Sequence, residues 1–189
     1  MKALMTGLAL IGCLILAVSS CTILPKAQPS AVHDFGYPNS HALSEISTPT
    51  QQAPITVEAP KWLFDNRIRY RLLYADPTQV RFYSLDRWIA PPPELFEQLL
   101  NASSKQRPKP ITIQLDVFEQ QFDSPDKAKV VMHFSATTTP DDKQYKPRTR
   151  DFNLQLPCPT PDAKGVVTGF NLLTKQAVDK VQAWLMEAN

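Results

Sequence analysis

The sequence predicts an α/β domain in which a mixed, mostly antiparallel sheet of about five or six strands is covered by two helices. Three observations support this prediction: two hairpins whose residues alternate between apolar and polar, an amphipathic helix between them, and a second amphipathic helix near the C-terminus. The order hairpin, helix, hairpin, strand, helix is typical of a sheet with helical cover. We expect one folded domain, at residues 55–189.

The first twenty residues have the order of an export signal. Lys2 supplies a positive charge, residues 3–18 are mostly apolar, and two serines precede Cys21. The apolar run, of about 16 residues, is shorter than the ~20 residues that a membrane-spanning helix needs, so a cleaved signal is favoured over a transmembrane anchor. Residues 18–21 resemble the bacterial lipobox, which implies cleavage after residue 20 and acylation of Cys21 (by palmitate, for example).

Residues 21–54 are expected to form an extended linker. They are rich in proline, serine, threonine and glutamine, and they have too few large apolar residues to offset the entropy of ordering. The exception is the stretch 33–37, whose two aromatic residues would suit docking as a short strand. Thr22 follows the lipobox cysteine in place of the aspartate that typically retains a lipoprotein in the inner membrane, so we expect the outer membrane, on its periplasmic face.

The cysteine content and the charge restrict the kind of protein further. Cys13 lies in the signal and Cys21 is the expected anchor, so Cys158 has no intrachain disulfide partner, and a cysteine-based metal site is excluded. The formal charge of +2 falls by one when Lys2 is removed. Such a small charge gives no support to nucleic-acid binding.

The first hairpin follows a short strand at residues 55–57. Residues 67–72 alternate between arginines on one face and apolar side chains on the other, a turn is expected at residues 76–78, and residues 80–83 return. We interpret the arginine row as a solvated sheet face, with an anion site as the alternative. These arginines are Arg67, Arg69 and Arg71.

A helix is expected to begin at the three prolines 91–93, because proline is tolerated in the first helical turn. Its apolar residues follow at helical spacing: Leu95, Phe96, Leu99 and Leu100. Trp88 and Ile89 precede these prolines, where they would be either core or partly exposed, and we favour the core.

The second hairpin is the clearest pattern in the chain. Residues 111–117 and 127–139 alternate on either side of a turn at 123–126, and residues 150–156 add another strand. The last helix is expected to begin between Asp162 and Asn171 and to continue to residue 187. Gly165 and Gly169 lie four residues apart, which would permit close approach to the sheet or make the start of this helix irregular.

No catalytic constellation is recognisable. The chain lacks the nucleophile-elbow, zinc-protease and phosphate-loop motifs. Cys158 with His133 as base is conceivable, but a lone cysteine after a strand is expected to be structural. Asp116 and Glu119 have an odd separation along a strand and face opposite sides. We therefore expect a protein that is not an enzyme and that holds neither a cofactor nor a metal.

Two short motifs, together with the order of elements, resemble the auxiliary lipoproteins of bacterial ABC-type transport systems. The motifs are residues 34–36 (Asp-Phe-Gly) in the tail and residues 88–91, which match a W-x-x-P step into the first helix. The resemblance covers roughly residues 55–187 and points to the paraquat-inducible lipoprotein type, which accompanies MCE proteins in intermembrane lipid transport. It implies a three-layer domain, MCE-type or ABC transporter components as partners, and a partner interface at Trp88, Ile89 and Pro91.

The function hypothesis is therefore a non-enzymatic lipoprotein subunit of an ABC- or MCE-type lipid transport system. Two alternatives stay open. The domain would itself carry an apolar ligand if it enclosed a cavity of a few hundred Å³. It would otherwise be a structural plug or assembly lipoprotein of the outer membrane.

Overall fold

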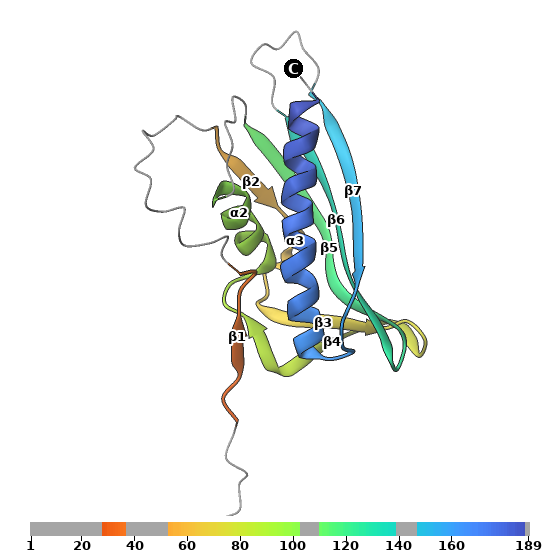
Figure 1. The fold of residues 1–189 in the computed structure, drawn as a ribbon. Coiled ribbons are helices and arrows are strands. Elements are labelled where there is room, and N and C mark those ends of the chain that lie inside the picture. The colour runs from red at the N-terminus through yellow and green to blue at the C-terminus, as the bar shows by residue number, and fades with distance from the viewer. Residues whose placement is uncertain (1–27, 37–52, 103–109, 139–146, 188–189) are drawn as a thin grey trace, which may run out of the picture.

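The computed structural model describes residues 28–36, 53–102, 110–138 and 147–187. The expected α/β class is confirmed: a mixed sheet carries two α-helices (Figure 1). The elements are β1 (Ala31–His33), β2 (Ile55–Glu58), the 3-10 turn η2 (Lys61–Leu63), β3 (Arg67–Leu72), β4 (Asp76–Trp88), α2 (Pro92–Ala102), β5 (Ile111–Ser124), β6 (Lys127–Thr138), β7 (Thr149–Pro157) and α3 (Ala163–Met186).

The sheet has seven strands in the described part of the chain, where five or six were expected. Its order is β1-β4-β3-β5-β6-β7, and β2 pairs with β5 beside the β3–β5 contact. The β3–β4, β5–β6 and β6–β7 pairs are antiparallel, whereas β1–β4, β2–β5 and β3–β5 are parallel. Both parallel and antiparallel neighbours are thus present, and the antiparallel pairs are the longer ones.

The layers differ from the three that the family resemblance implied. Both helices lie on one face of the sheet and contact each other, so the described domain has a sheet layer and a helix layer (Figure 1). On β7, Phe152 and Leu154 are buried while the residues between and before them are exposed. That alternation is what a strand produces when only one sheet face is covered.

The core between the layers is built around stacked aromatic rings. Phe118 of β5 and Phe170 of α3 stack with centroids 3.7 Å apart, and Trp88 meets Phe170 edge-on at 5.9 Å. A second cluster joins Phe134 to Phe152 at 4.8 Å. Each buried aromatic removes a large apolar surface from water, so these rings supply much of the stability that a disulfide would otherwise provide.

The helix α3 begins at Ala163, the early end of the expected range. Asp162 is its N-cap, and the carboxylate accepts a hydrogen bond of 2.8 Å from the Gly165 N–H. A Cβ on Gly165 would lie 1.8 Å from the carbonyl oxygen of Thr160, and one on Gly169 would lie 2.9 Å from Val130. Both glycines therefore permit close approach, and the helix is regular through them.

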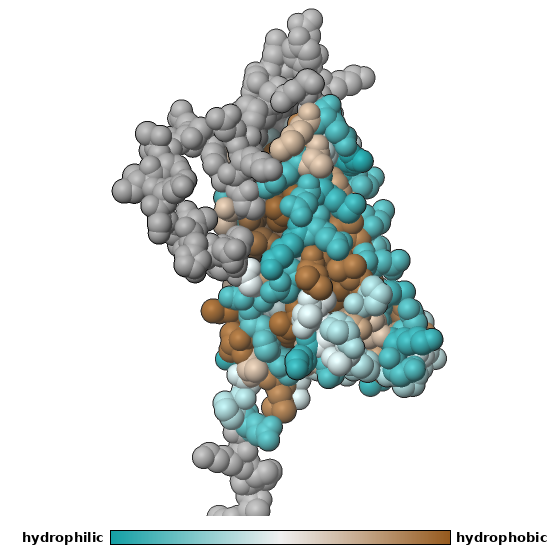
Figure 2. Space-filling model, in the orientation of Figure 1, coloured by the Kyte–Doolittle hydropathy of each residue, from teal (hydrophilic) through white to brown (hydrophobic). Residues whose placement is uncertain are grey.

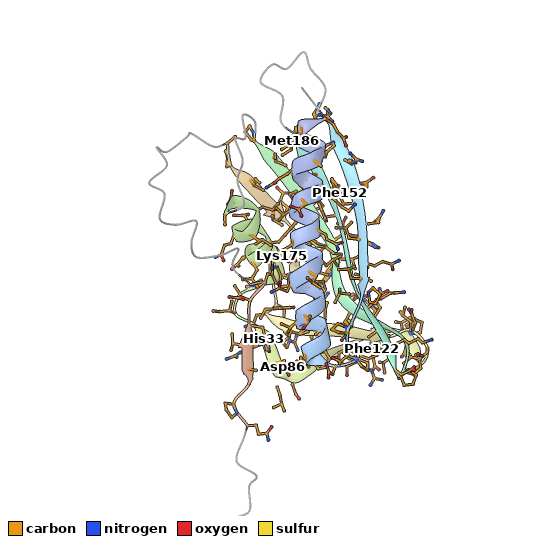
Figure 3. All side chains as sticks on the ribbon, in the orientation of Figure 1. His33, Asp86, Phe122, Phe152, Lys175 and Met186 are labelled. Carbon is orange, nitrogen blue, oxygen red and sulfur yellow. The ribbon has the colours of Figure 1, made fainter. Side chains whose placement is uncertain are left out.

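The segment 28–36 lies inside the expected linker, yet it belongs to the domain. β1 adds to the edge of β4, and His33 Nε2 lies 2.8 Å from Asp86 Oδ1 (Figure 3). Phe35 is buried in the core, whereas Tyr37 lies outside the described residues. The sequence predicted a docked strand within residues 33–37, whereas the strand observed, β1, ends at His33. The prediction was therefore a few residues too far along the chain.

The first hairpin turns earlier than expected. β3 ends at Leu72, which pairs with Asp76, so the chain reverses at residues 73–75. Asp76 Oδ1 accepts hydrogen bonds from the N–H and the hydroxyl of Thr78, an interaction within the start of β4. β4 then runs on to Trp88, so the step that precedes α2 is itself part of the sheet.

Candidate interaction surface

The residues expected to carry function differ in their location and exposure in the structure. Cys21 lies outside the described residues. Trp88 is only 1% exposed, so its assignment to a partner interface is wrong. The alternation of β4 turns its indole toward the helices, where Phe35 and Phe170 cover it. The core placement that we favoured is confirmed for Trp88 and wrong for Ile89, which is 64% exposed because it follows Trp88 on the opposite face. Pro91 is partly exposed, so Ile89 and Pro91 remain available at the surface.

Ile89 and Pro91 line a groove of about 630 Å³ at the end of the sheet that carries β1. Two aromatic residues from the turn η2 and its C-cap share this groove: Trp62, 63% exposed, and Phe64, 49% exposed. We call this region the Trp62 surface; it consists of Lys61, Trp62, Phe64, Arg67, Arg69, Phe82, Ile89 and Pro91. Figure 2 shows brown, apolar residues gathered beside β1 and below α2.

The guanidinium groups of this surface lie over an aromatic ring. The Cζ of Arg67 is 3.8 Å from the centroid of Phe82, and that of Arg69 is 5.9 Å away. Arg67 Nε also donates to Asp65 Oδ2 at 2.8 Å, and this hydrogen bond lowers the pKa of Asp65. Arg69 donates to the carbonyl oxygen of Trp62 at 2.7 Å, which fixes η2 against β3.

The third residue of the arginine row behaves differently. Arg71 Nε lies 2.9 Å from both carboxylate oxygens of Glu119, which is buried on β5. Its Nη1 donates to the carbonyl oxygens of Pro77 and Thr78 across the hairpin. Arg71 is thus committed to a structural ion pair between β3 and β5, and the solvated-face interpretation fits Arg67 better.

Cys158 belongs to a half-buried polar chain rather than to a catalytic pair. Tyr83 donates to Gln120 Oε1 at 2.7 Å, and Gln120 Nε2 donates to Cys158 Sγ at 3.4 Å. Burial raises the pKa of the Cys158 thiol and that of Tyr83. The Cys158 N–H donates to the carbonyl oxygen of Ala128, so Cys158 lies beside the start of β6. His133 is five residues further along that strand, which places it about 17 Å from Ala128 at ~3.4 Å per residue. These two residues are not brought together.

Within the described ranges, no group of three or more His, Cys, Asp and Glu side chains is placed to hold a metal ion. No helix in the described part of the chain is both long and apolar enough to cross a membrane.

Sequence reasoning did not identify Trp62 and Phe64. They flank Leu63 in the four-residue stretch 61–64, which has no strand alternation and is too short for a helical period. Only Leu63 enters the core. The available signal was the presence of two aromatics within four residues of Pro60, in a segment too short to bury both.

Comparison with solved structures reveals shared architecture. A crystal structure of a Xanthomonas campestris protein described under the family DUF330 aligns with a TM-score of 0.62 at 16% identity, covering 82% of this chain and 94% of that one. A second crystal structure, of an uncharacterized protein, aligns with a TM-score of 0.61 at 13% identity, covering 86% and 100%. No family model matches the sequence, and no curated protein matches it. At these identities the likeness establishes the fold.

Proposed function

We propose that the chain is a non-enzymatic, membrane-anchored lipoprotein subunit of an ABC- or MCE-type intermembrane lipid transport system, attached at the periplasmic face of the outer membrane. The observation that carries the proposal is the lipobox-like stretch at residues 18–21, followed ten residues after Cys21 by a strand of the domain. A lipid on Cys21 would then hold the sheet edge close to a membrane. A transport machine that connects two membranes needs such a fixed attachment point.

The filled interior supports an accessory role over that of a lipid carrier. The space between sheet and helices is occupied by the stacked rings of Phe35, Trp88, Phe118 and Phe170. An apolar pocket of about 190 Å³ lies between Gly36 and α2. That is smaller than the ~300–1,000 Å³ typical of ligand pockets, and the larger groove of about 630 Å³ is open at the Trp62 surface rather than enclosed between the sheet and the helices.

The shared architecture adds indirect support. The DUF330 protein has a similar fold, so the domain on which the family resemblance rests also occurs in another protein. The family resemblance implied partner contacts at Ile89 and Pro91, and both residues lie at the surface of the domain.

Crosslinking in cells tests the proposal. The full chain would be expressed with its own signal, treated with an amine-reactive crosslinker, and its partners identified by mass spectrometry. Among the exposed lysines of the described residues, four offer reaction sites on η2 and α3: Lys61, Lys164, Lys175 and Lys180. The matched control is Cys21→Ser, which keeps all four lysines and removes only the acylation site.

We expect wild type to recover an MCE or ABC transporter component and the Cys21→Ser chain to lose it. Recovery of neither component from wild type would remove the basis of the accessory role. Co-purifying lipid in stoichiometric amount would favour the carrier, and crosslinking to an outer-membrane barrel would favour the plug.

A further inference from the structure

The exposed apolar side chains near β1 share the uncovered face of the sheet. Along β4 and the residue after it, Leu85, Arg87 and Ile89 alternate with Asp86 and Trp88, which point toward the helix layer. Leu85 and Ile89 are exposed, as is Val32, which pairs with Arg87 from β1. These side chains continue the Trp62 surface up to the edge of the sheet.

The charge on this face is positive. The groove of the Trp62 surface is lined by Lys61, Arg67 and Arg69 against the single carboxylate of Asp65 among its described lining residues. Arg87 is exposed, and it is the Cα partner of Arg67 across the β3–β4 pair. Exposed tryptophan and phenylalanine interleaved with cations are the composition of surfaces that lie in the headgroup region of a bilayer.

The chain leads directly from the expected anchor to this face. Ala31 lies ten residues after Cys21, and a fully extended chain of ten residues spans at most ~35 Å. β1 is fixed to β4, and the Ile89 N–H donates to the His33 carbonyl at 2.8 Å. The Trp62 surface therefore begins at β1, the first strand after the expected anchor at Cys21. The chain between Cys21 and β1 limits how far this surface can lie from the membrane.

We propose that the Trp62 surface rests on the anionic lipid surface of the membrane that holds the anchor. Trp62, Phe64 and Ile89 lie among the headgroups, and the neighbouring cations face lipid phosphates. This inference rests on the proposed anchoring at Cys21, which supplies the membrane. An acidic protein would satisfy the cations, but it would not by itself explain three large apolar side chains exposed next to the tether.

Trp62 is a built-in reporter for this contact. The chain has three tryptophans, and Trp88 and Trp184 are 1% and 3% exposed. The acylated full chain would be reconstituted into vesicles of phosphatidylethanolamine and phosphatidylglycerol that contain brominated acyl chains, which quench fluorescence on contact. We expect strong quenching in wild type and its loss in Trp62→Phe, whose remaining indoles are buried.

A charge-removal pair tests the role of the cations. In Lys61→Gln/Arg87→Gln the affinity of the surface for anionic lipid should fall about 25-fold, because each cation near an anionic surface contributes about fivefold to binding, and the quenching should fall with it. The matched control is Lys175→Gln/Lys180→Gln, which removes the same charge from exposed positions on α3, the helix that carries Lys175 in Figure 3, and should quench as wild type does. Circular dichroism of each variant verifies that the fold is retained.

The outcomes separate this inference from the anchoring itself. Vesicle flotation reports the anchor, and Trp62 quenching reports the surface. A chain that floats without quenching, or that is quenched equally in phosphatidylcholine vesicles, overturns the inference and leaves the anchoring intact. If the chain expressed in cells proves not to be acylated, that result refutes the anchor, and quenching of Trp62 by added anionic vesicles still supports the inference. Shielding of Trp62 only when a protein partner is added overturns it.

Discussion

Phe35 meets Trp88 edge-on, with ring centroids 5.1 Å apart and planes at 81°. The same phenylalanine stacks on Phe118 at 5.4 Å, so a residue from the N-terminal segment completes the aromatic core of a domain formed by distant parts of the chain. Phe35 is 3% exposed. The segment that leads to the expected anchor is therefore held by core packing as well as by β1 pairing.

Replacing Phe35 by alanine should destabilise the domain by about 3–5 kcal/mol, the usual cost of removing a buried phenylalanine. Val32→Ala is the matched control on the same segment, since Val32 is exposed, and it should change stability by less than about 0.5 kcal/mol. Urea unfolding followed by far-ultraviolet circular dichroism measures both. Equal stabilities would mean that the segment does not pack on the domain in solution.

Gly165→Ala should destabilise the domain by about 1–3 kcal/mol. A Cβ there would meet the backbone carbonyl of Thr160 at 1.8 Å, and backbone cannot move aside as a side chain does. The gain in helix propensity, about 1 kcal/mol, offsets only part of this cost. At Gly169 the new Cβ meets the methyl groups of Val130, which can rotate, so Gly169→Ala should cost less. Thermal unfolding of the two variants gives the order, and the reverse order would contradict the packing at Thr160.

Asp162 should stabilise α3 only above acidic pH. Hydrogen bonds from the Thr160 hydroxyl and the Gly165 N–H lower the pKa of this carboxylate. A lowered pKa in the folded state means that the contribution is present above the unfolded pKa of about 3.9 and is lost as the pH falls through the folded value. Asp162→Ala should therefore cost about 0.5–2 kcal/mol at pH 7 and much less near pH 2.

The measurement for Asp162 is the free energy of unfolding at both pH values. Asp179→Ala is the control, because Asp179 is exposed in the middle of α3, away from the cap. A cost for Asp162→Ala that is unchanged near pH 2 would show that the charge of the carboxylate plays no part in the cap.

The parts of the fold that follow local patterns are predictable from sequence. Alternation identifies β5 and β6, and the apolar spacing of Leu95, Phe96, Leu99 and Leu100 identifies α2, because burial on one face fixes the period. The parallel pairings of β1 with β4 and of β2 with β5 join distant segments. No local period encodes such contacts, so the sheet order could not be predicted.

The candidate surface was only partly predictable for the same reason. Trp88 and Ile89 are adjacent in sequence and equally apolar, but strand alternation sends the first into the core and leaves the second exposed. Which of the two is buried depends on β4 continuing to Trp88, and the sequence pattern did not show that this strand extends so far. Trp62 becomes part of a surface because Arg69 and Phe82 lie beside it, and both come from strands whose pairing the sequence leaves open.

Cys158 should react slowly with iodoacetamide in the folded protein. Burial raises the pKa of its thiol, so the reactive thiolate is scarcer at neutral pH than in a free cysteine. Alkylation at pH 8 should be several-fold slower than for the same protein in urea, and the folded rate should still be rising with pH where an unfolded cysteine levels off. Mass spectrometry of the peptide that contains Cys158 gives both rates. A folded rate equal to the unfolded one would contradict the half-buried placement of Cys158 beside Gln120.

Cys21→Ser should remove the lipid anchor without weakening the domain. Serine lacks the thiol that receives the lipid, and stable anchoring needs two or more acyl chains, so no other group replaces it. Position 21 lies ten residues before β1 and outside every contact described for the domain, so the unfolding midpoint should match that of wild type. Membrane fractionation, with a mass measurement of the mature N-terminus, checks the result: the variant should be unacylated and either soluble or retained with its signal uncut. A Cys21→Ser chain that stays on the membrane with its signal removed, in the absence of any partner, would refute the lipoprotein anchor.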